Sequence, residues 1–278
     1  MLIVSSISEM QSLTSRLPRP VVLVPTMGAL HSGHLSLVRR AKREAREGGA
    51  TVTSIFVNPK QFGPNEDYKR YPRTYERDCE LLREIGCDIV FAPEASAMYF
   101  ADSTTTVVET ELSALLCGAS RPGHFSGVCT VVSKFFHIVQ PRIAVFGQKD
   151  YQQFLILQRM VRDLNFSVQV ISEPTVREPD GLALSSRNAY LTPAERAQAP
   201  VIHQTLLQTE KLIRTHQIGF GEIENWMASN ISSAKLSKVD YVAAVDPGTL
   251  ESKKSLPLLL ACAVYFGSTR LIDNRLIT

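Results

Sequence analysis

The fold of this chain is decided by the stretch Val21-Val22-Leu23-Val24-Pro25-Thr26-Met27-Gly28-Ala29-Leu30-His31-Ser32-Gly33-His34. Its first four residues are apolar and mostly β-branched, and Pro25 closes them, which is typical of a fully buried strand. From His34 onward, apolar residues recur at helical spacing, at Leu35, Val38, Ala41 and Ala45. A strand that turns through glycines into a helix predicts a phosphate site, because N–H groups at a helix start carry partial positive charge.

Two histidines accompany this turn. His31 and His34 are three positions apart and share one face if the first turn is helical, so each imidazole can add a hydrogen-bond donor for phosphate oxygens. On the residues alone, a chance surface pair or a core pair with satisfied hydrogen bonds remains open. Neither a Walker A motif nor G-x-G-x-x-G occurs here, so kinase-like and dinucleotide-binding functions lose their main support.

Composition narrows the class of protein. The 278 residues suffice for a main domain and a smaller one, and 30 Lys and Arg against 27 Asp and Glu give a net charge of +3. This charge does not favour a nucleic-acid partner, but it suits a compact anionic ligand. Five cysteines without a C-x-x-C pair argue against a disulfide framework and a zinc site. Without a signal peptide or a spanning apolar segment, we expect a cytoplasmic protein with no membrane partner.

Further strands and helices alternate along the chain. Strand patterns lie at 51–57, 88–92, 142–146 and about 166–172, helical patterns lie at 74–85, 128–139 and about 150–163, and 104–110 is typical of an extra strand. Strands joined by helices predict right-handed crossovers and a mostly parallel sheet that binds its ligand at the carboxyl ends of the strands.

The pattern changes after about residue 177. Thr192 and Glu195 form a capping box with Pro193 at the first helical position, which predicts the start of a long helix. Helices are expected at 193–216 and 221–234, and strands near 239–245 and 258–266, followed by the terminal run Arg270-Leu271-Ile272-Asp273-Asn274. We therefore expect an α/β protein with a Rossmann-like parallel-sheet domain at 1–176 and a smaller α+β domain at 177–278.

Polar residues follow a predicted strand at Gly147-Gln148-Lys149-Asp150. The Lys149 ammonium suits an α-phosphate, and Asp150 is placed either to hold that lysine or to help position a magnesium ion. Gln153 lies one turn further on the same side. The alternative, that these residues are only the solvated start of a helix, stays open.

Three other clusters are candidates. Asn58 and Gln61 follow the second strand of the sheet, and an amide offers both a donor and an acceptor to a hydroxy acid, although Gln61 is equally typical of an ordinary loop. The run Ser185-Ser186-Arg187 suits the β- and γ-phosphates of a triphosphate, but is weak alone. For Arg121 and His124, a structural role is favoured.

Taken together, five motifs resemble those of a known protein family. They are Pro25-Thr26-Met27-Gly28-Ala29-Leu30-His31-x-Gly33-His34, Phe56-Val57-Asn58-Pro59-x-Gln61-Phe62, Arg121-Pro122-Gly123-His124-Phe125, Lys149-Asp150-Tyr151-Gln152-Gln153 and Asp180-Gly181-Leu182-Ala183-Leu184-Ser185-Ser186-Arg187-Asn188. In this order, across nearly the whole chain, they resemble the pantoate–β-alanine ligases, members of the H-x-G-H nucleotidyltransferase superfamily.

The resemblance implies a two-step reaction. Pantoate attacks the α-phosphate of ATP to give pantoyl adenylate and pyrophosphate, and β-alanine then displaces AMP to give pantothenate. It also implies that His34, His31 and Lys149 are catalytic, with His34 either an acid or a stabiliser of the pentacovalent phosphorus. A homodimer with a C-terminal lid domain is implied as well.

The same resemblance assigns the binding residues. ATP is expected at Met27, Gly28, Ala29, Leu30, His31, Ser32, Gly33, His34, Gly147, Gln148, Lys149, Asp150, Val176, Leu184, Ser185, Ser186 and Arg187. Pantoate and β-alanine are expected at Gln61, Gln153 and Asn58. The Mg²⁺ that accompanies ATP is expected near Asp78 or Asp150, held mainly through water.

Two positions depart from the family pattern, and two other functions compete. Lys60 stands where methionine is common, and Gln148 where glutamate is commonest; both changes make the pocket more positive. One competitor is another H-x-G-H nucleotidyltransferase, which would release pyrophosphate without β-alanine-dependent AMP formation. The other is a nucleotide-binding regulator that lacks turnover.

Overall fold

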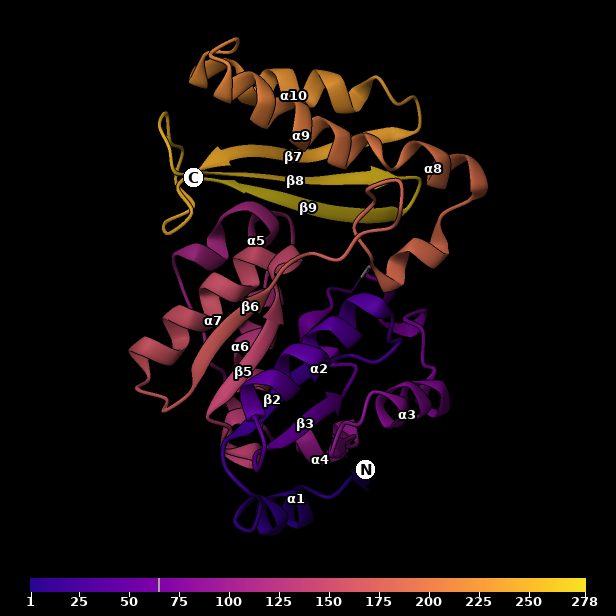
Figure 1. Ribbon diagram of the computed structural model, residues 1–278, viewed down its shortest axis with the longest axis vertical. Helices are drawn as coiled ribbons and strands as arrows, with labels where there is room; N and C mark the ends of the chain where they lie inside the picture. The colour runs from indigo at the N-terminus through magenta and orange to yellow at the C-terminus, as the bar shows by residue number, and fades with distance from the viewer. Residues whose placement is uncertain (65) are drawn as a thin grey trace. The chain divides into compact units, whose positions relative to one another are not determined.

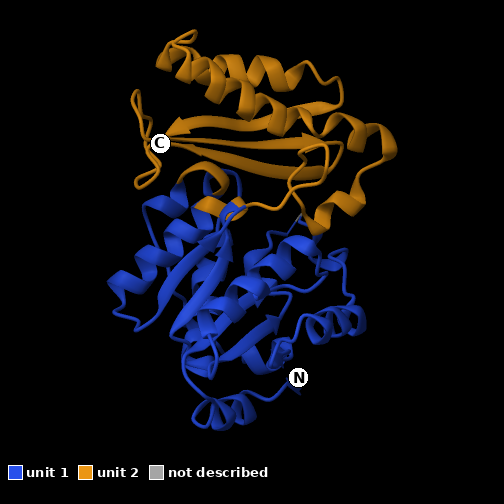
Figure 2. Ribbon diagram, viewed as in Figure 1, with its two compact units in different colours: residues 1–114, 118–148, 152–174 blue, residues 115–117, 149–151, 175–278 orange. Residues whose placement is uncertain are grey.

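The computed structural model describes residues 1–64 and 66–278, which form two compact units (Figures 1 and 2). The first unit comprises Met1–Ala114, Gly118–Gln148 and Gln152–Pro174. The second comprises Thr175–Thr278 and two short pieces, Leu115–Cys117 and Lys149–Tyr151. Lys149 therefore belongs to the second unit, although the segments before and after its three-residue piece belong to the first.

A parallel sheet forms the centre of the first unit. Its described strands are β1 (Leu2–Val4), β2 (Val21–Thr26), β3 (Ala50–Ile55), β4 (Ile89–Phe91), β5 (Ile143–Gly147) and β6 (Gln169–Glu173), in the order β1-β4-β3-β2-β5-β6. The pairing of β2 with β3 runs in register from Val21 opposite Ala50 to Thr26 opposite Ile55. These two strands therefore end together, which brings the turn after Thr26 beside the loop after Ile55.

Helices cover both faces of this sheet. The described helices up to residue 163 are α1 (Ile7–Thr14), α2 (Ser32–Ala45), α3 (Tyr75–Glu84), α4 (Ala95–Met98), α5 (Leu116–Ser120), α6 (His124–Val139) and α7 (Tyr151–Asp163), of which α5 and α7 begin in pieces of the second unit. On one face, Val38 of α2 and Leu82 of α3 share a buried core with Val22 of β2. On the other face, Phe135 of α6 packs edge-on against Phe91 of β4. The predicted Rossmann-like parallel sheet is confirmed.

The second unit has an antiparallel sheet of three described strands in the order β7-β8-β9 (Figure 1). These are β7 (Ser237–Val245), β8 (Leu258–Phe266) and β9 (Thr269–Ile277), and the helices are α8 (Pro193–Gln198), α9 (Val201–Arg214) and α10 (Ile223–Ser232). Leu206 of α9 and Met227 of α10 are fully buried and share a core with Leu260 of β8. This α+β arrangement is the one expected from the sequence.

Two expectations about elements are wrong. Residues 104–110 form no strand: the Val107 N–H donates to Thr130 Oγ1, and the Glu109 carboxylate accepts the next backbone N–H groups, from 111 to 113. Side chains thus occupy backbone donors of the kind that a strand partner would take. The helix expected at 193–216 is two helices, because Pro200 has no N–H to continue the ladder.

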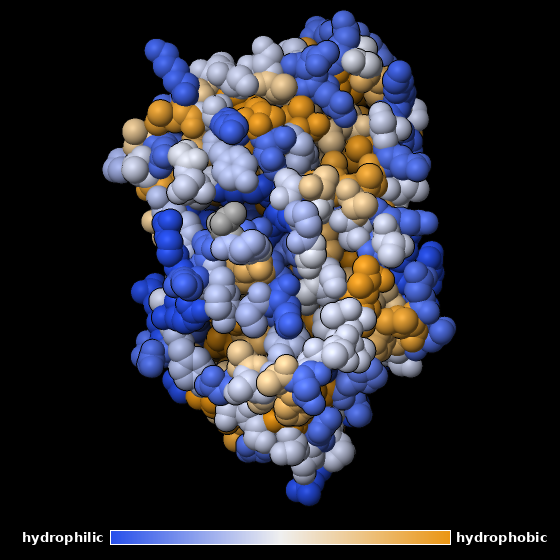
Figure 3. All heavy atoms as spheres, turned by 180° about the vertical axis from the view of Figure 1, so that it is seen from behind, coloured by the Kyte–Doolittle hydropathy of each residue, from blue (hydrophilic) through white to orange (hydrophobic). Residues whose placement is uncertain are grey.

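The sequence patterns also missed the short first strand β1 and the helix α1 after it. Ser6 caps α1 by accepting the Glu9 N–H, and β1 extends the sheet beyond β4. None of the described helices is long and apolar enough to cross a membrane. On the face shown in Figure 3, hydrophilic side chains surround smaller groups of hydrophobic ones.

Candidate active site

The turn after β2 has a backbone that requires glycine at its first bend. Gly28 has φ of +75°, and a Cβ there would lie 2.9 Å from Asp78 Oδ2 and 3.1 Å from Ile55 Cγ2. The Gly28 N–H donates to Thr26 Oγ1 at 3.2 Å. Both the conformation and the available space exclude a side chain here. Glycine therefore allows the chain to bend sharply between β2 and α2.

Asp78, on α3, holds the other side of this turn. Its Oδ2 accepts the Ala29 N–H and its Oδ1 accepts the Leu30 N–H, both at 2.8 Å, and Oδ1 also accepts the Thr74 hydroxyl at 3.0 Å. The side chain is buried. These contacts use the carboxylate to fix the turn, which is a different task from the magnesium binding expected of Asp78.

The two histidines cap the start of α2 reciprocally. His31 Nδ1 accepts the Gly33 N–H at 3.1 Å, and His34 Nδ1 accepts the His31 N–H at 3.3 Å. The ring centroids lie 4.0 Å apart. Since each Nδ1 is an acceptor, the neutral rings carry their proton on Nε2, and each presents an Nε2–H donor.

Several backbone N–H groups of this turn have partners within the protein. Those of Ala29, Leu30, His31 and Gly33 donate to side chains. Side chains therefore engage these four amides in this structure.

A second cluster follows β3, where η1 (Pro59–Gln61) carries Gln61. The Gln61 Oε1 accepts from Asn58 Nδ2 at 3.1 Å, and its Nε2 donates to Met27 Sδ at 3.0 Å. The amide is therefore fixed beside the turn that carries the histidines. Gln61 thus lies next to the H-x-G-H turn, where β2 and β3 end together.

Asn58 is buried and engaged on both sides of its amide. Its Nδ2 also donates to the Gly127 carbonyl at 3.0 Å, while Oδ1 accepts the Tyr99 hydroxyl at 2.8 Å and the Lys60 N–H at 3.2 Å. Burial raises the pKa of the Tyr99 phenol, so it remains a donor. Asn58 supports Gln61 in this structure, and Tyr99 is a contributor that the sequence patterns missed.

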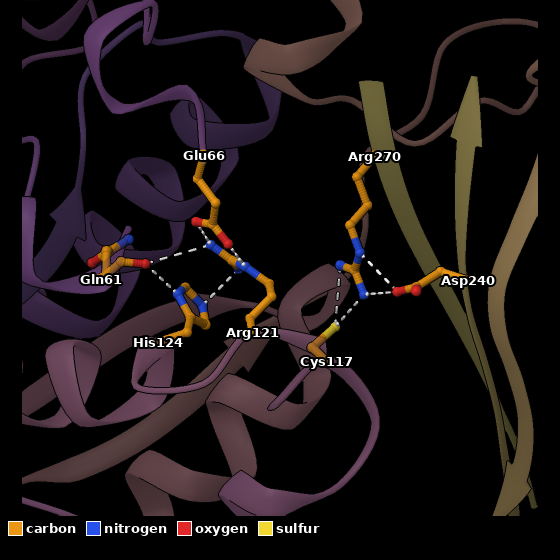
Figure 4. A network of polar contacts seen from close by, with 7 residues as sticks. All are labelled: Gln61, Glu66, Cys117, Arg121, His124, Asp240 and Arg270. Atoms are coloured by element: carbon orange, nitrogen blue, oxygen red, sulfur yellow. Dashed lines mark hydrogen bonds and ion pairs between the residues drawn. The ribbon is translucent and has the colours of Figure 1, made fainter. Parts of the chain in front are cut away.

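The backbone of Gln61 is held by a network that includes Arg121 and His124 (Figure 4). The Gln61 carbonyl accepts from His124 Nδ1 at 2.7 Å, and Arg121 Nη1 donates to His124 Nε2 at 2.9 Å. Arg121 also donates to both oxygens of Glu66 at 2.7 Å. Burial alone would raise the pKa of Glu66, but the hydrogen bonds and charge of Arg121 outweigh it and hold the pKa below its usual value. Arg121 and His124 therefore support the Gln61 main chain in this structure.

In the first unit, Gly147 ends β5, Gln148 follows it, and Gln153 lies half-buried at the start of α7. The second unit carries Lys149, Asp150, Val176, Leu184, Ser185, Ser186 and Arg187. Within it, the Leu184 N–H donates to the Val176 carbonyl at 3.0 Å, and Ser185 Oγ accepts the Arg187 N–H at 3.3 Å as the cap of η5 (Ser186–Tyr190). Asp150 is exposed and Lys149 half-buried.

Comparison with known proteins decides the family. The model of the pantoate-beta-alanine ligase family matches residues 2–276. A pantothenate synthetase of Thermotoga neapolitana is 51% identical over 282 residues, covering 100% of both chains, and one of Moorella thermoacetica is 53% identical over 254 residues, covering 91% of this chain and 89% of the other. This chain belongs to the pantoate-beta-alanine ligase family.

Solved structures of this family have the same fold. A crystal structure of pantothenate synthetase from Thermus thermophilus matches with a TM-score of 0.92 at 48% identity and covers 99% of each chain. That of pantoate-beta-alanine ligase from Francisella tularensis, complexed with beta-gamma ATP and beta-alanine, matches with 0.82 at 35%, covering 99% of this chain and 97% of that one. The chain is accordingly a ligase that joins pantoate to β-alanine in pantothenate synthesis.

The departure at Lys60 lies at the edge of the Gln61 cluster. The Lys60 side chain is exposed, and its Nζ lies 5.8 Å from the centroid of the Tyr99 ring. Lys134 Nζ lies 5.7 Å from the same centroid. The added positive charge therefore lies near the face of an aromatic ring.

Proposed function

We propose that this ligase activates pantoate as an acyl adenylate. A pantoate carboxylate oxygen attacks the α-phosphorus of ATP, and the bond to the β-phosphate oxygen breaks to release pyrophosphate. The β-alanine amine then attacks the acyl carbon, loses a proton and expels AMP, which leaves the amide bond of pantothenate. Adenylation is needed because a free carboxylate repels a nucleophile and has no good leaving group.

The observation that carries this proposal is the reciprocal capping of His31 and His34. It fixes both rings before any ligand binds and leaves the proton of each neutral ring on Nε2. Preorganised donors of this kind are worth about 2.7–4 kcal/mol each when charge develops in the transition state. We assign both histidines to stabilising the pentacovalent α-phosphate, rather than His34 to proton transfer.

The other roles follow from the chemistry of each side chain. Lys149 supplies a point charge for the phosphate oxygens, and Gln61 and Gln153 hold pantoate, with Asn58 keeping Gln61 in place. By the family resemblance, we assign ATP binding to the turn from Met27 to His34 and to Gly147–Asp150, Val176 and Leu184–Arg187. The Francisella tularensis relative, complexed with beta-gamma ATP and beta-alanine, supports ATP and β-alanine as substrates.

Magnesium enters this scheme as part of the ATP substrate. In the described part of the chain, no three His, Cys, Asp or Glu residues gather into a group able to hold a metal, and Asp78 uses both its oxygens on backbone N–H groups. Phosphate oxygens and water therefore supply most of its ligands, as Mg²⁺ prefers. Asp150, exposed beside Lys149, remains our candidate for a water-mediated contact.

We extend the proposal to the whole protein on the family resemblance. The chain works as a cytoplasmic homodimer, with neither nucleic acid nor membrane as a partner. A nucleotide-binding domain spans residues 1–176, and a lid domain spans 177–278.

The test is to follow pyrophosphate and AMP while substrates are omitted in turn. We expect pyrophosphate from Mg·ATP and pantoate alone, and AMP with pantothenate only after β-alanine is added. Pyrophosphate without β-alanine-dependent AMP would indicate another nucleotidyltransferase. ATP binding without either product would indicate a non-catalytic regulator.

A further inference from the structure

Two consecutive buried polar residues lie in the last strand of the second unit. Asp273 and Asn274 of β9 are 4% and 7% exposed, and β9 pairs only with β8 among the described strands. Burying a carboxylate and an amide in a sheet is costly unless each has hydrogen-bond partners. The hydrogen-bond partners of these two side chains therefore show which segments they position.

Asn274 holds the main chain of Lys149. Its Nδ2 donates to the Lys149 carbonyl at 2.8 Å, across 125 residues of sequence. At the other end of the three-residue piece, the Tyr151 hydroxyl donates to the Pro247 carbonyl at 3.2 Å. Two hydrogen bonds therefore hold the Lys149–Tyr151 piece within the second unit, and one of them is to the main chain of Lys149 itself.

Asp273 holds the loop that leads to Ser185. Arg177 donates to Asp273 Oδ2 at 2.6 Å and to Oδ1 at 2.9 Å, and also to the Gly181 carbonyl at 3.1 Å. Arg177 and Ala183 face each other across an antiparallel bridge, so this ion pair fixes both sides of the loop. A bidentate arginine–carboxylate pair sets orientation as well as distance.

The two anchors are coupled through one peptide bond. The Asn274 N–H donates to Asp273 Oδ1 at 2.8 Å, which is the same oxygen that Arg177 Nη2 contacts. A displacement of Asp273 is therefore expected to displace Asn274 as well, and the reverse.

We propose that Asp273 and Asn274 form one positioning element, which aligns Lys149 with the Ser185–Arg187 loop for the phosphates of ATP. It rests on the proposed function of Lys149. Neither residue needs to touch substrate: Asn274 acts through the lysine main chain, and Asp273 acts through Arg177.

The reason for such an anchor lies in the lysine side chain. Its ammonium sits on a flexible stem of four carbons, so its reach is defined only if the backbone is fixed. A misplacement of about 1 Å at a reacting centre costs as much as about 100-fold in rate. A single hydrogen bond to the Lys149 carbonyl is therefore expected to matter for rate more than for stability.

A double-mutant cycle between Asn274 and Lys149 tests this. Asn274→Ala should slow single-turnover pyrophosphate formation about tenfold, because Lys149 loses its anchor. In a Lys149→Ala background, the same change should cost less than about twofold. Asn274→Asp, which keeps the shape but removes the Nδ2 donor, is the second variant and replaces alanine if Asn274→Ala does not fold.

The matched control is Asn230→Ala in the same unit. Asn230 donates to Thr205 Oγ1 at 2.8 Å between α10 and α9, and its replacement should change the rate less than about twofold while thermal unfolding reports its structural cost. An equal loss in both Lys149 backgrounds, or no loss in the wild type, would overturn the positioning role alone. Full activity of Lys149→Ala would overturn the proposed role of Lys149 and the positioning role with it.

Discussion

At the scale of single residues, two nitrogen atoms set the chemistry of the H-x-G-H turn. The Nδ1 atoms of His31 and His34 accept backbone N–H groups, so protonation at either Nδ1 would break a capping bond. The neutral Nε2–H form is therefore the one that the fold stabilises. A donor that stays neutral can stabilise charge on phosphate without having to release its own proton.

Replacement of His34 separates this catalytic task from the cap. His34→Ala should lower kcat by about 10²–10³, because one preorganised donor is lost, and should cost only about 1 kcal/mol of stability for the lost cap. Steady-state kinetics and thermal unfolding measure the two effects. His137→Ala, an exposed histidine on α6, is the control. An unfolded His34→Ala protein would show that the ring is mainly structural.

Asp78 gives a prediction that distinguishes turn positioning from metal binding. Asp78→Asn places an amide donor opposite one of the two N–H groups of Ala29 and Leu30, so it should cost about 1–3 kcal/mol of stability. We expect the KM for ATP to rise about tenfold as the turn loosens. The Mg²⁺ concentration for half-maximal activity should stay within about twofold of wild type; a large shift would restore the magnesium role. Glu76→Gln, exposed on the same helix, is the control.

At the scale of elements, the site depends on how closely η1 packs on α6. A Cβ at Gly127 would lie 2.3 Å from the Lys60 carbonyl oxygen and 2.7 Å from the Gln61 nitrogen. Asn58 bridges the same contact through the Gly127 carbonyl. The glycine therefore sets the approach of the helix to the turn that carries Gln61.

Gly127→Ala should displace this turn. Alanine favours the helix, but the clash is with backbone atoms, so we expect a net loss of about 1–3 kcal/mol and a higher KM for pantoate. Gly221→Ala, where a Cβ meets nothing within 4 Å, is the matched control for the same change of residue. An unchanged KM for pantoate would contradict the role of this contact in holding Gln61.

The ion pair of Glu66 with Arg121 predicts a dependence of stability on pH. The folded pKa of Glu66 lies below its ordinary value of 4.5, so its stabilising effect is present above about pH 4.5 and is lost as pH falls through the folded pKa. Glu66→Gln should therefore lower the free energy of unfolding by about 1 kcal/mol at neutral pH, and the difference should shrink below about pH 4.5. Urea unfolding at several pH values measures it, with Glu47→Gln as an exposed control. A difference that does not vary with pH would contradict the assignment.

The sequence predicted those elements whose own hydrophobic pattern is strong. The β2 strand and α2 helix match because their burial follows the pattern, and the capping box at Thr192 is formed. The strand prediction for residues 104–110 failed where Thr130 Oγ1 accepts the Val107 N–H and Glu109 caps the residues that follow, contacts that no local pattern reveals.

For the candidate site too, the sequence predicted what depends on local patterns and missed contacts between distant residues. The neighbourhood of Gln61 and the H-x-G-H turn followed from the ends of adjacent strands. The contacts of Asp78 with the turn, and of Asn274 with Lys149, join residues 48 or more positions apart and leave no local signal.

At the scale of the whole molecule, the residues assigned to ATP are divided between two compact units. The turn with both histidines lies in the first, and Lys149 with the Ser185–Arg187 loop lies in the second. Each set can be preorganised by contacts within its own unit. Asp78 does this for the first set, and Asp273 with Asn274 for the second.

The most direct test of the account is an oxygen-transfer measurement. The complete reaction is run with pantoate labelled with ¹⁸O in both carboxylate oxygens, and the AMP is examined by mass spectrometry. The acyl adenylate predicts one ¹⁸O atom in each AMP, because the attacking oxygen leaves with the phosphorus. AMP without ¹⁸O, formed together with pantothenate, would show that the carboxylate never bonded to the α-phosphate and would contradict the account.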